Sequence, residues 1–237
     1  MIAPGDRADA RSIALLGGTG AQGRGLALRF AIAGYSVLLG SRDAQRADAS
    51  AIALNEQLVE QEVGHRATIL GTENAAAAEG ADTVIIAVPY SGHAALIHSL
   101  RNQLAGKTVI SCVNPITFDA LGPQGIRPEA GSAAEEAAEL VPEARMVAAF
   151  HHLSAPRLLN ADADLTGEDV LLCGDDEDAL AVVEELTRVG LGATPVRAGA
   201  LRLSGTLEAM TAVIISVNLR YRVNAGLALT GLPLASD

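Results

Sequence analysis

The chain has 237 residues, of which 49% are hydrophobic, and carries a formal net charge of −11 at pH 7. This length predicts one large domain, or a domain with a small appendage, with ample apolar content for a core. The acidic balance disfavours nucleic acid as a partner, because a phosphate backbone requires a basic face. No apolar run reaches the ~18 residues of a membrane span. Residues 1–11 lack the apolar core of a secretory signal and are expected to form a frayed tail, so we expect a cytoplasmic protein.

Apolar runs alternate with helical patterns along most of the chain. Strands are predicted at Ile13–Leu16, Ser36–Leu39, Thr68–Leu70, Thr83–Val88, Thr108–Val113, Met146–Phe150, Val170–Cys173 and Thr194–Arg197. Helices are predicted at Arg24–Ala33, Ala44–Val63, Glu73–Glu79, Ala94–Leu104, Ser132–Leu140 and Glu177–Val189. Repeated β-α units of this kind predict an α/β fold with a Rossmann-like, doubly wound, mostly parallel sheet. Ligands of such sheets bind beyond the carboxyl ends of the strands.

The first predicted strand runs into a glycine-rich turn. Gly18, Gly20 and Gly23 have the G-x-G-x-x-G spacing that, between a strand and a helix, is typical of dinucleotide-binding sites. There the first glycine allows a tight turn, the second admits a pyrophosphate, and the third lets the helix pack on the strand. The helix N-terminus adds N–H groups and the positive end of its dipole. The alternatives are a structural glycine turn and the G-x-x-G-x-x-G pattern of short-chain dehydrogenases, through Gly17, Gly20 and Gly23.

The tip of the second strand indicates which nucleotide is bound. NAD sites place Asp or Glu here to accept from the ribose hydroxyl. This chain has Gly40 instead, followed by Ser41 and Arg42, with Arg46 one turn into the next helix. A hydroxyl and two guanidinium groups suit a 2′-phosphate, because Arg offers forked, charge-assisted donors. The sequence therefore predicts NADP. The alternative is an exposed Ser-Arg turn in which Asp43 is the functional acid.

The fourth strand ends in Val88, Pro89 and Tyr90, followed shortly by His93. We expect this edge to border the nicotinamide ribose and ring. Tyr90 is one of six aromatic residues, three Tyr and three Phe. It either covers a ring face or is an ordinary tyrosine at a strand boundary.

The next two strand ends continue the same predicted edge. The fifth strand ends in Val113 and Asn114, and the sixth in Phe150, followed by His151 and His152. Adjacent histidines in an extended segment face opposite ways, so at most one is expected to reach the cleft, and we favour His151. The alternative is a pair of loop histidines without a role in binding.

After Gly199 the pattern changes to that of one amphipathic helix. Its apolar stripe is predicted to be Leu203, Leu207, Met210, Ile214, Val217 and Tyr221. The opposite face is not strongly charged, which predicts a helix covered on both sides, for example at the interface of a homodimer. Residues 224–233 are expected to form a packed loop. We therefore divide the chain into a cofactor domain with its sheet extension, residues 1–198, and a C-terminal helix and tail in the same globule, residues 199–237.

Cysteine and lysine usage limit the chemistry. Cys112 and Cys173 each end an apolar strand and are predicted to be buried thiols, and no Cys/His cluster indicates a metal. Lys107 is the only lysine, so a reaction that needs a catalytic lysine elsewhere is excluded. No tyrosine is followed by lysine four residues later, which excludes short-chain dehydrogenase chemistry.

Seven motifs in this order resemble the F420-dependent NADP reductase family. They are Leu-Leu-Gly-Gly-Thr-Gly at 15–20, Gly-Leu-Ala-Leu-Arg at 25–29, Gly-Ser-Arg at 40–42, Val-Asn-Pro at 113–115, Ser-Ala-Ala-Glu at 132–135, Phe-His-His at 150–152 and Cys-Gly-Asp-Asp at 173–176. The similarity runs from about residue 12 to residue 232. It implies an enzyme that moves a hydride between NADP(H) and the 8-hydroxy-5-deazaflavin coenzyme F420.

The resemblance also implies site residues. The phosphate loop corresponds to Thr19, Gly20, Ala21 and Gln22, and the 2′-phosphate contacts to Ser41, Arg42 and Arg46. The nicotinamide edge corresponds to Pro89, Tyr90, His93 and Ile97, with Val113 and Ala155 also touching the cofactor. The deazaflavin pocket is expected around His151, Leu153, Ala228 and Leu229, and residues 116–131 are expected to form a loop that departs from the family's usual form.

The expected chemistry is direct hydride transfer between two stacked rings in a dry pocket, without a covalent nucleophile. His151 is the candidate catalytic residue, as a donor to charge that develops on the reduced deazaflavin. Two alternatives stay open: an NADPH-dependent reductase of an imine, carbonyl or flavin, and a non-catalytic NADP-binding redox sensor.

Overall fold

The computed structural model describes residues 12–60 and 68–232. The central sheet contains β1 (Ser12–Leu16), β2 (Ser36–Ser41), β3 (Ile69–Glu73), β4 (Thr83–Ile86), β5 (Thr108–Ser111), β8 (Arg145–Ala148), β9 (Asp169–Gly174) and β10 (Thr194–Gly199), and β6 (Ile116–Asp119) and β7 (Gly122–Gly125) form a separate hairpin. The helices are α1 (Ala21–Ile32), α2 (Ala44–Glu60), α3 (Asn74–Glu79), α4 (His93–Ser99), α5 (Arg101–Leu104), α6 (Ala133–Leu140), α7 (Ala155–Leu159), α8 (Glu177–Glu185) and α9 (Ser204–Tyr221), with short helical turns η1 (Tyr90–Gly92), η2 (Leu186–Leu191) and η3 (Leu201–Leu203).

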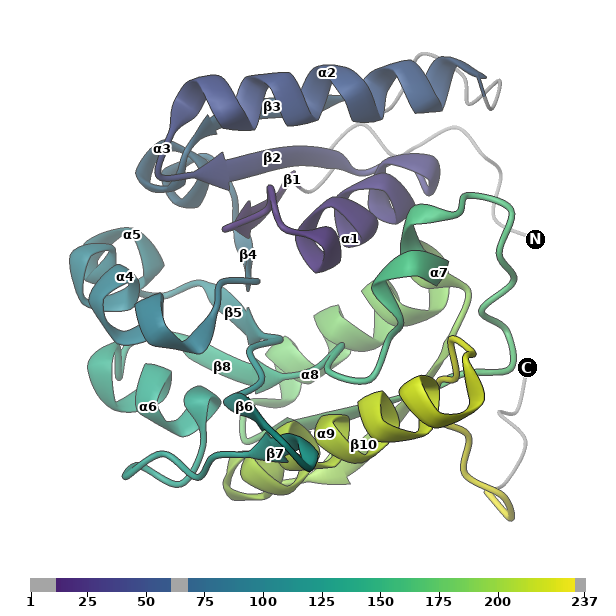
Figure 1. The fold of residues 1–237 in the computed structure, drawn as a ribbon. Coiled ribbons are helices and arrows are strands. Elements are labelled where there is room, and N and C mark those ends of the chain that lie inside the picture. The colour runs from purple at the N-terminus through teal and green to yellow at the C-terminus, as the bar shows by residue number, and fades with distance from the viewer. Residues whose placement is uncertain (1–11, 61–67, 233–237) are drawn as a thin grey trace.

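The eight strands are arranged in the order β10-β9-β8-β5-β4-β1-β2-β3, with helices on both faces (Figure 1). From β3 to β8 the neighbouring strands are parallel, whereas β9 is antiparallel to β8 and β10 is parallel to β9. The predicted doubly wound, mostly parallel α/β sheet is therefore confirmed. Because of the reversal at β9, it is the start of this strand, at Asp169, that lies at the same edge as the carboxyl ends of the parallel strands.

Side chains that alternate along the strands build two cores, one on each face of the sheet. Ile13 and Leu15 of β1 belong to the core under α1, α2, α7 and α8, whereas Ala14 and Leu16 belong to the core under α3, α4 and α6. Both faces of the strand are buried, which explains why its sequence is a continuous apolar run rather than an alternating one. The sheet is thereby a rigid support for the loops at its edge.

Several predicted elements differ at their ends. The helix expected over residues 94–104 is interrupted at Leu100, where φ −109° and ψ 13° separate α4 from α5. The strand expected to reach Phe150 stops at Ala148, because Phe150 has φ 66° and cannot continue a strand. The helix predicted to Val189 ends as η2, a π-helical segment. The predicted N-terminal tail and the last residues of the helix predicted to Val63 lie outside the described residues.

A hairpin and a short helix were not predicted. The segment expected to be a loop over residues 116–131 contains the β6–β7 hairpin, and the short helix α7 follows the two histidines. The hairpin packs on α9, where an added Cβ on Gly125 would lie 3.0 Å from the Cβ of Ala209. In α1, Gly25 allows α7 to approach closely, because an added Cβ would lie 2.5 Å from the Cβ of Leu158.

The predicted apolar stripe of the C-terminal helix is wrong in part. α9 buries Ser204, Leu207, Glu208, Thr211 and Ala212 against the rest of the molecule. Of the predicted stripe only Leu207 is fully buried, and Leu203, Val217 and Tyr221 are exposed. The buried polar side chains face inward because each finds a partner there: Ser204 donates to Leu201 O at 2.6 Å, and the partners of Glu208 and Thr211 are described below. None of the described helices is both long and apolar enough to cross a membrane.

Candidate functional site

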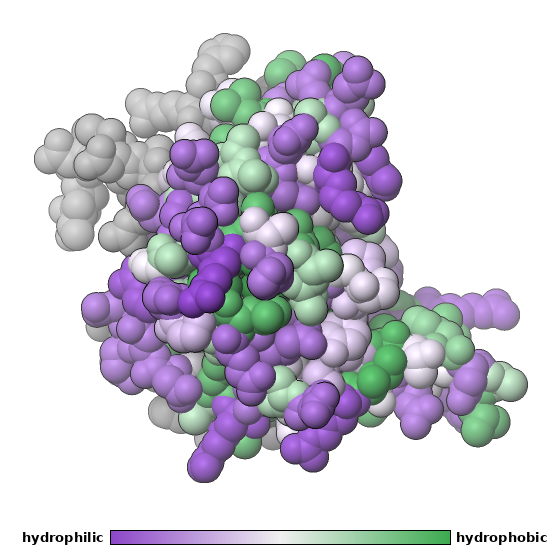
Figure 2. All heavy atoms as spheres, turned by 90° about the vertical axis from the view of Figure 1, so that its left-hand side faces the viewer, coloured by the Kyte–Doolittle hydropathy of each residue, from purple (hydrophilic) through white to green (hydrophobic). Residues whose placement is uncertain are grey.

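Five strand ends bring most of the predicted site residues to one edge of the sheet. In spatial order β2, β1, β4, β5 and β8 lie side by side and parallel, so the loops that follow them form a continuous row. The carboxyl ends of parallel strands form the edge at which open α/β sheets bind ligands. Figure 2 shows a neighbouring side of the molecule, the left-hand side of Figure 1 where α4 and α6 lie, with hydrophobic atoms exposed near its centre and hydrophilic side chains around them.

The turn after β1 has a different requirement at each glycine. An added Cβ on Gly18 would lie 2.8 Å from the carbonyl oxygen of Leu15, and one on Gly23 would lie 2.6 Å from the Cα of Gly18. Gly20 is different, because its added Cβ would meet only the Gly17 carbonyl oxygen, at 3.7 Å. Gly18 and Gly23 therefore serve packing within the protein, whereas the open side of Gly20 leaves room for a ligand to approach the backbone.

The N-terminus of α1 is directed at the same space. Arg24 N donates to Gly20 O at 2.9 Å, which leaves the N–H groups of Ala21, Gln22 and Gly23 without a partner inside the helix. Such N–H groups, with the helix dipole behind them, suit the oxygens of a pyrophosphate. Thr19 precedes them and is half-buried. The arrangement fits a phosphorylated dinucleotide.

The turn after β1 touches the end of β4. An added Cβ on Gly17, where φ is 69°, would lie 2.4 Å from Cγ1 of Val88, and Gly17 N donates to Oδ1 of Asn74 at 3.1 Å. Asn74, the first residue of α3, thus fixes the glycine turn from outside the motif. The sequence did not point to Asn74, because its partner lies 57 residues away.

The end of β2 carries two free cationic groups. Arg42 and Arg46 are exposed, and neither forms an ion pair with a residue that the structure describes. Ser41 is buried, and its Oγ accepts from Asp43 N at 3.3 Å. Asp43 Oδ1 accepts from Gln45 N and Arg46 N, at 2.9 Å and 3.2 Å, so this carboxylate caps the start of α2. The capping role counts against Asp43 as a ribose ligand and leaves the two guanidinium groups available.

The edge after β4 contains a network around one carboxylate. Glu136 of α6 accepts from Tyr90 through Oε1 at 3.3 Å and binds Nδ1 of His93 through Oε2 at 2.7 Å. The two rings lie 5.9 Å apart between centroids. Ile97 and Val113 are buried in the core cluster that also holds Leu16, so they support this edge from within. Pro89, in contrast, is exposed.

Three side chains hold the backbone after β8. Gln22 Nε2 donates to Phe150 O at 3.1 Å, and Asn114 Nδ2 donates to His151 O at 3.4 Å. Thr211 of α9 lies between Asn114 and this backbone, with its Oγ1 3.1 Å from Asn114 Oδ1 and 3.3 Å from His151 O. The phosphate turn, the end of β5 and α9 therefore meet at one point. Thr211 was not recognised from the sequence as part of the site.

The two histidines do not lie in an extended segment, so the geometry assumed for them is wrong. They follow the left-handed residue Phe150 in a turn, and both are buried. His152 donates through Nε2 to Leu207 O at 2.9 Å and so attaches α9. His151 is 4% exposed, and neither ring nitrogen has a partner among the described residues. Burial, reinforced by the neighbouring His152, lowers the pKa of His151 to about 3, so its ring is neutral near pH 7.

The C-terminal tail reaches the same region. Asp169 borders a small recess together with His151 and Leu153. Leu229 N donates to Asp169 Oδ2 at 2.6 Å, and Asp169 N donates to Leu227 O at 2.8 Å. The structure thus brings Leu229 to the residue that adjoins His151, with Ala228 and Leu229 themselves exposed. Ala155, at the start of α7, is half-buried near the same turn.

The lysine and the two cysteines of the chain have structural roles and contribute no group to this row of loops. Lys107 donates to the carbonyl oxygens of Ala78, Glu79 and Ala81, which holds the end of α3. Both cysteines are buried and free, as predicted, and burial raises the pKa of Cys112 to about 12. Across residues 12–60 and 68–232 no group of three or more His, Cys, Asp or Glu is placed to hold a metal ion.

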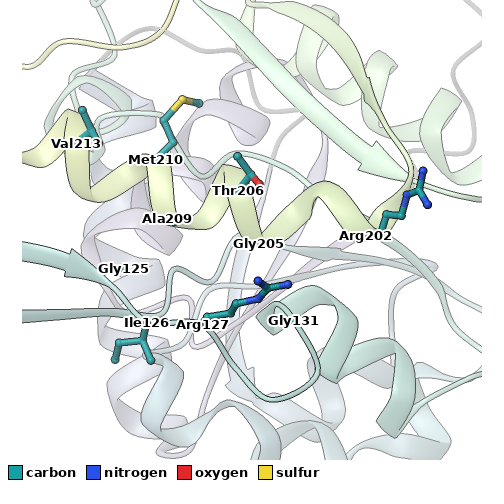
Figure 3. Close-up of a pocket in the computed structure, with 10 residues that line it drawn as sticks. All are labelled: Gly125, Ile126, Arg127, Gly131, Arg202, Gly205, Thr206, Ala209, Met210 and Val213. Carbon is teal, nitrogen blue, oxygen red and sulfur yellow. The ribbon is translucent and has the colours of Figure 1, made fainter.

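A groove of about 530 Å³ lies elsewhere, between α9 and the segment that follows the β6–β7 hairpin (Figure 3). Its walls are largely apolar around Ile126, Met210 and Val213, and Arg127 and Arg202 line it toward the start of α9. None of the predicted site residues lines it. It uses the face of α9 opposite to Thr211, so it is a separate feature from the row of loops.

Comparison with known proteins adds independent findings. Residues 12–115 match the family described as NADP oxidoreductase, coenzyme F420-dependent. The chain is 37% identical over 227 residues to the F420-dependent NADP reductase of Methanothermobacter thermautotrophicus, covering 93% of this chain and 95% of that one. It is 35% identical to the enzyme of the same description from Methanocaldococcus jannaschii, over 94% of this chain and 99% of the other.

A solved structure agrees with these matches. The crystal structure of a provisionally assigned F420-dependent NADP reductase from Arthrobacter sp. FB24 superposes with a TM-score of 0.74 at 26% identity, covering 92% of this chain and 98% of that one.

Proposed function

This chain belongs to the F420-dependent NADP reductase family, and on that premise we propose that it transfers a hydride between NADP(H) and coenzyme F420. The 8-hydroxy-5-deazaflavin would be the second substrate. The family relationship supports oxidoreduction with these two coenzymes in general, and the proposal goes further in assigning the activity to this chain and its residues.

The observation that carries the proposal is the spatial order of the loops. Cationic side chains follow β2, unpartnered helix N–H groups follow β1, an aromatic and amide edge follows β4 and β5, and a buried neutral histidine follows β8. A dinucleotide laid along this row would place its 2′-phosphate at β2, its pyrophosphate at β1 and its nicotinamide at β4 and β5. The second ring would then lie toward β8 and the C-terminal tail.

Each residue would act by binding or orienting. Arg42 and Arg46, with Ser41, would hold the 2′-phosphate, and the N–H groups of Ala21 and Gln22 would hold the pyrophosphate. Val88, Tyr90 and the amide of Asn114 would line the nicotinamide side. NADPH would supply the hydride and the deazaflavin would accept it, which requires two rings at near-attack distance in a dry space rather than a nucleophile.

His151 would contribute as a neutral donor. The low pKa set by burial means that the ring cannot serve as a cation, but it can donate one N–H to an oxygen that gains negative charge on reduction. The absence of any partner for its nitrogens among the described residues leaves that N–H available. Leu153, Ala228 and Leu229 would form the apolar side of the same subsite.

The decisive experiment follows the absorbance of oxidised F420 when it is mixed with the protein and NADPH. Bleaching at a rate proportional to protein concentration is the expected result. Tight NADPH binding without bleaching would contradict the reductase proposal and favour a redox sensor. Parallel assays with flavin, imine and carbonyl acceptors distinguish the remaining reductases.

We further propose that the protein is a homodimer whose contact uses the exposed side of α9. That side carries Val213, Val217, Leu219 and Tyr221, all exposed in the single chain. Sedimentation at micromolar concentration is expected to show a dimer, and a monomer throughout that range would contradict it.

A further inference from the structure

Glu136 joins two residues of the proposed nicotinamide edge. It lies on α6, beside α4 in Figure 1, and its two carboxylate oxygens are divided between the Tyr90 hydroxyl at 3.3 Å and His93 Nδ1 at 2.7 Å. The side chain of His93 is 0% exposed, whereas that of Glu136 is 25% exposed. A carboxylate that keeps some contact with water is thus bound to an imidazole that has none.

This contact determines which nitrogen of His93 carries the proton. Burial lowers the pKa of His93 despite the nearby carboxylate, so the ring is neutral and has one N–H. A carboxylate oxygen accepts but does not donate, so at 2.7 Å the proton must lie on Nδ1. The other nitrogen, Nε2, then has a lone pair and can only accept a hydrogen bond.

That acceptor has no partner within the described part of the chain. Nε2 of His93 is buried and makes no hydrogen bond. Leaving a buried acceptor unsatisfied is unfavourable, and most buried polar atoms in folded proteins have a partner. His93 begins α4, just beyond the end of β4 at the ligand edge, where a bound nucleotide would bring hydrogen-bond donors. The nicotinamide nucleoside offers two kinds, the carboxamide N–H and the ribose hydroxyls.

We propose that Glu136 is a positioning residue that holds His93 as a hydrogen-bond acceptor for the nicotinamide nucleoside of NADP(H). This inference rests on the proposed function as far as the nucleotide is concerned, but it requires no reaction with F420. Tyr90 takes part by occupying the second carboxylate oxygen, which fixes the orientation of Glu136.

The test uses two variants of Glu136 and one control. In Glu136→Leu nothing accepts from Nδ1, so the ring is free to move its proton to Nε2. In Glu136→Gln the amide carbonyl can still accept from Nδ1, so this variant should keep the wild-type form. Glu139→Gln, on the exposed side of the same helix, removes a carboxylate that has no described partner and should change nothing.

Two measurements separate positioning from mere stability. The ¹⁵N chemical shifts of the His93 ring report its tautomer, and we expect Nδ1–H in the wild type and Glu136→Gln and loss of that form in Glu136→Leu. Calorimetric titration with NADP should show about three- to tenfold weaker binding by Glu136→Leu, the size expected for one hydrogen bond. Binding of 2′,5′-ADP, which lacks the nicotinamide nucleoside, should be unchanged.

The 3-acetylpyridine analogue of NADP identifies the donor, because it keeps the ribose hydroxyls but has no amide N–H. If the carboxamide is the donor, Glu136→Leu should bind this analogue as well as the wild type does. If a ribose hydroxyl is the donor, the variant should weaken analogue and NADP binding by the same factor.

The inference is overturned if the wild-type ring carries its proton on Nε2. It is also overturned if Glu136→Leu binds NADP as the wild type does, or if it weakens NADP and 2′,5′-ADP equally, which would indicate a structural role. A wild-type protein that binds NADP but does not bleach F420 would contradict the proposed function alone. A wild-type protein that binds no NADP would contradict both.

Discussion

The two ends of the row of loops are built in different ways. At β1 and β2 the site consists of backbone N–H groups and exposed guanidinium groups, and the carboxylate of Asp43 binds the backbone of its near neighbours Gln45 and Arg46. At β8 the backbone of residues 150–151 is held by side chains 37 to 128 residues away, and the ring of His151 is buried and neutral. The first end is open and charged, whereas the second is enclosed and apolar.

This difference matches the two kinds of ligand group that we propose to bind there, phosphates at the first end and a planar ring at the second. Phosphate groups are bound by charge-assisted hydrogen-bond donors. Such donors still bind phosphate at an exposed position when they are forked, as in Arg, and when several act together. A planar ring that exchanges a hydride needs water excluded, and exclusion requires segments from distant parts of the chain to converge. Gln22 connects the two ends, since it belongs to the phosphate turn and donates to Phe150 O.

The largest effect on stability and on NADPH binding should come from substituting a glycine of the turn after β1, at the charged end of the row. Gly23→Ala places a methyl group 2.6 Å from the Cα of Gly18, so we expect a loss of about 1–3 kcal/mol in unfolding free energy together with loss of NADPH binding. Gly20→Ala is the matched variant, since its methyl group meets only the Gly17 carbonyl oxygen, at an ordinary contact distance of 3.7 Å. It should keep the melting temperature but weaken NADPH binding, and equal melting temperatures for both variants would contradict the packing argument.

Arg42→Ala should have the next largest effect. A charge-assisted hydrogen bond contributes about 1.5–3 kcal/mol, so the KM for NADPH should rise by about one to two orders of magnitude while that for NADH changes little. Arg145→Ala is the control, because Arg145 is exposed, has no described partner and begins β8 at the opposite edge of the sheet. Equal changes for NADPH and NADH in Arg42→Ala would refute the 2′-phosphate assignment.

Near the enclosed end, one buried carboxyl group should make the unfolding free energy depend on pH. Glu208 is 1% exposed and accepts from Ala133 N and Ala134 N at the start of α6, at 2.9 Å and 3.1 Å. Burial outweighs these donors and raises the pKa of Glu208 to about 7 from its ordinary value of 4.5. A carboxyl group with a raised pKa binds more protons in the folded state, so its contribution to stability is complete below pH 4.5 and is lost as pH rises through 7.

Glu208→Gln should remove that pH dependence. In the wild type the unfolding free energy should fall between about pH 4.5 and pH 7 with a slope of at most ~1.4 kcal/mol per pH unit for this one proton. Denaturant unfolding at several pH values measures the slope. Glu139→Gln should leave it unchanged, and an equal slope in wild type and Glu208→Gln would show that Glu208 is not responsible.

The smallest effect should come from His151. Its His151→Ala variant loses one neutral donor, so single-turnover reduction of F420 by NADPH should slow about fivefold, the value of a hydrogen bond of ~1 kcal/mol. Because burial lowers the pKa of His151 to about 3, the wild-type rate should show no inflection between pH 6 and 7 from this residue. An unchanged rate in the variant would remove His151 from the reaction.

Much of the fold could be predicted because it depends on local pattern. Continuous apolar runs such as Ile13–Leu16 identify strands buried on both faces, and the glycine turn identifies where the first strand meets its helix. The β6–β7 hairpin escaped prediction because it lacks an alternating pattern. Its second strand is Gly-Pro-Gln-Gly, and Phe118 of the first strand is exposed.

The sequence by itself determined the order of strands and helices, the phosphate turn and the cationic tip of β2, because each depends on residues close together along the chain. Only the tertiary structure decided that Glu136 meets His93, that His151 is buried, and that α9 faces inward with Glu208 and Thr211. A polar side chain can be buried when it finds a hydrogen-bond partner inside the protein, and here those partners belong to segments that are distant in the sequence. Hydrophobic periodicity contains no information about them.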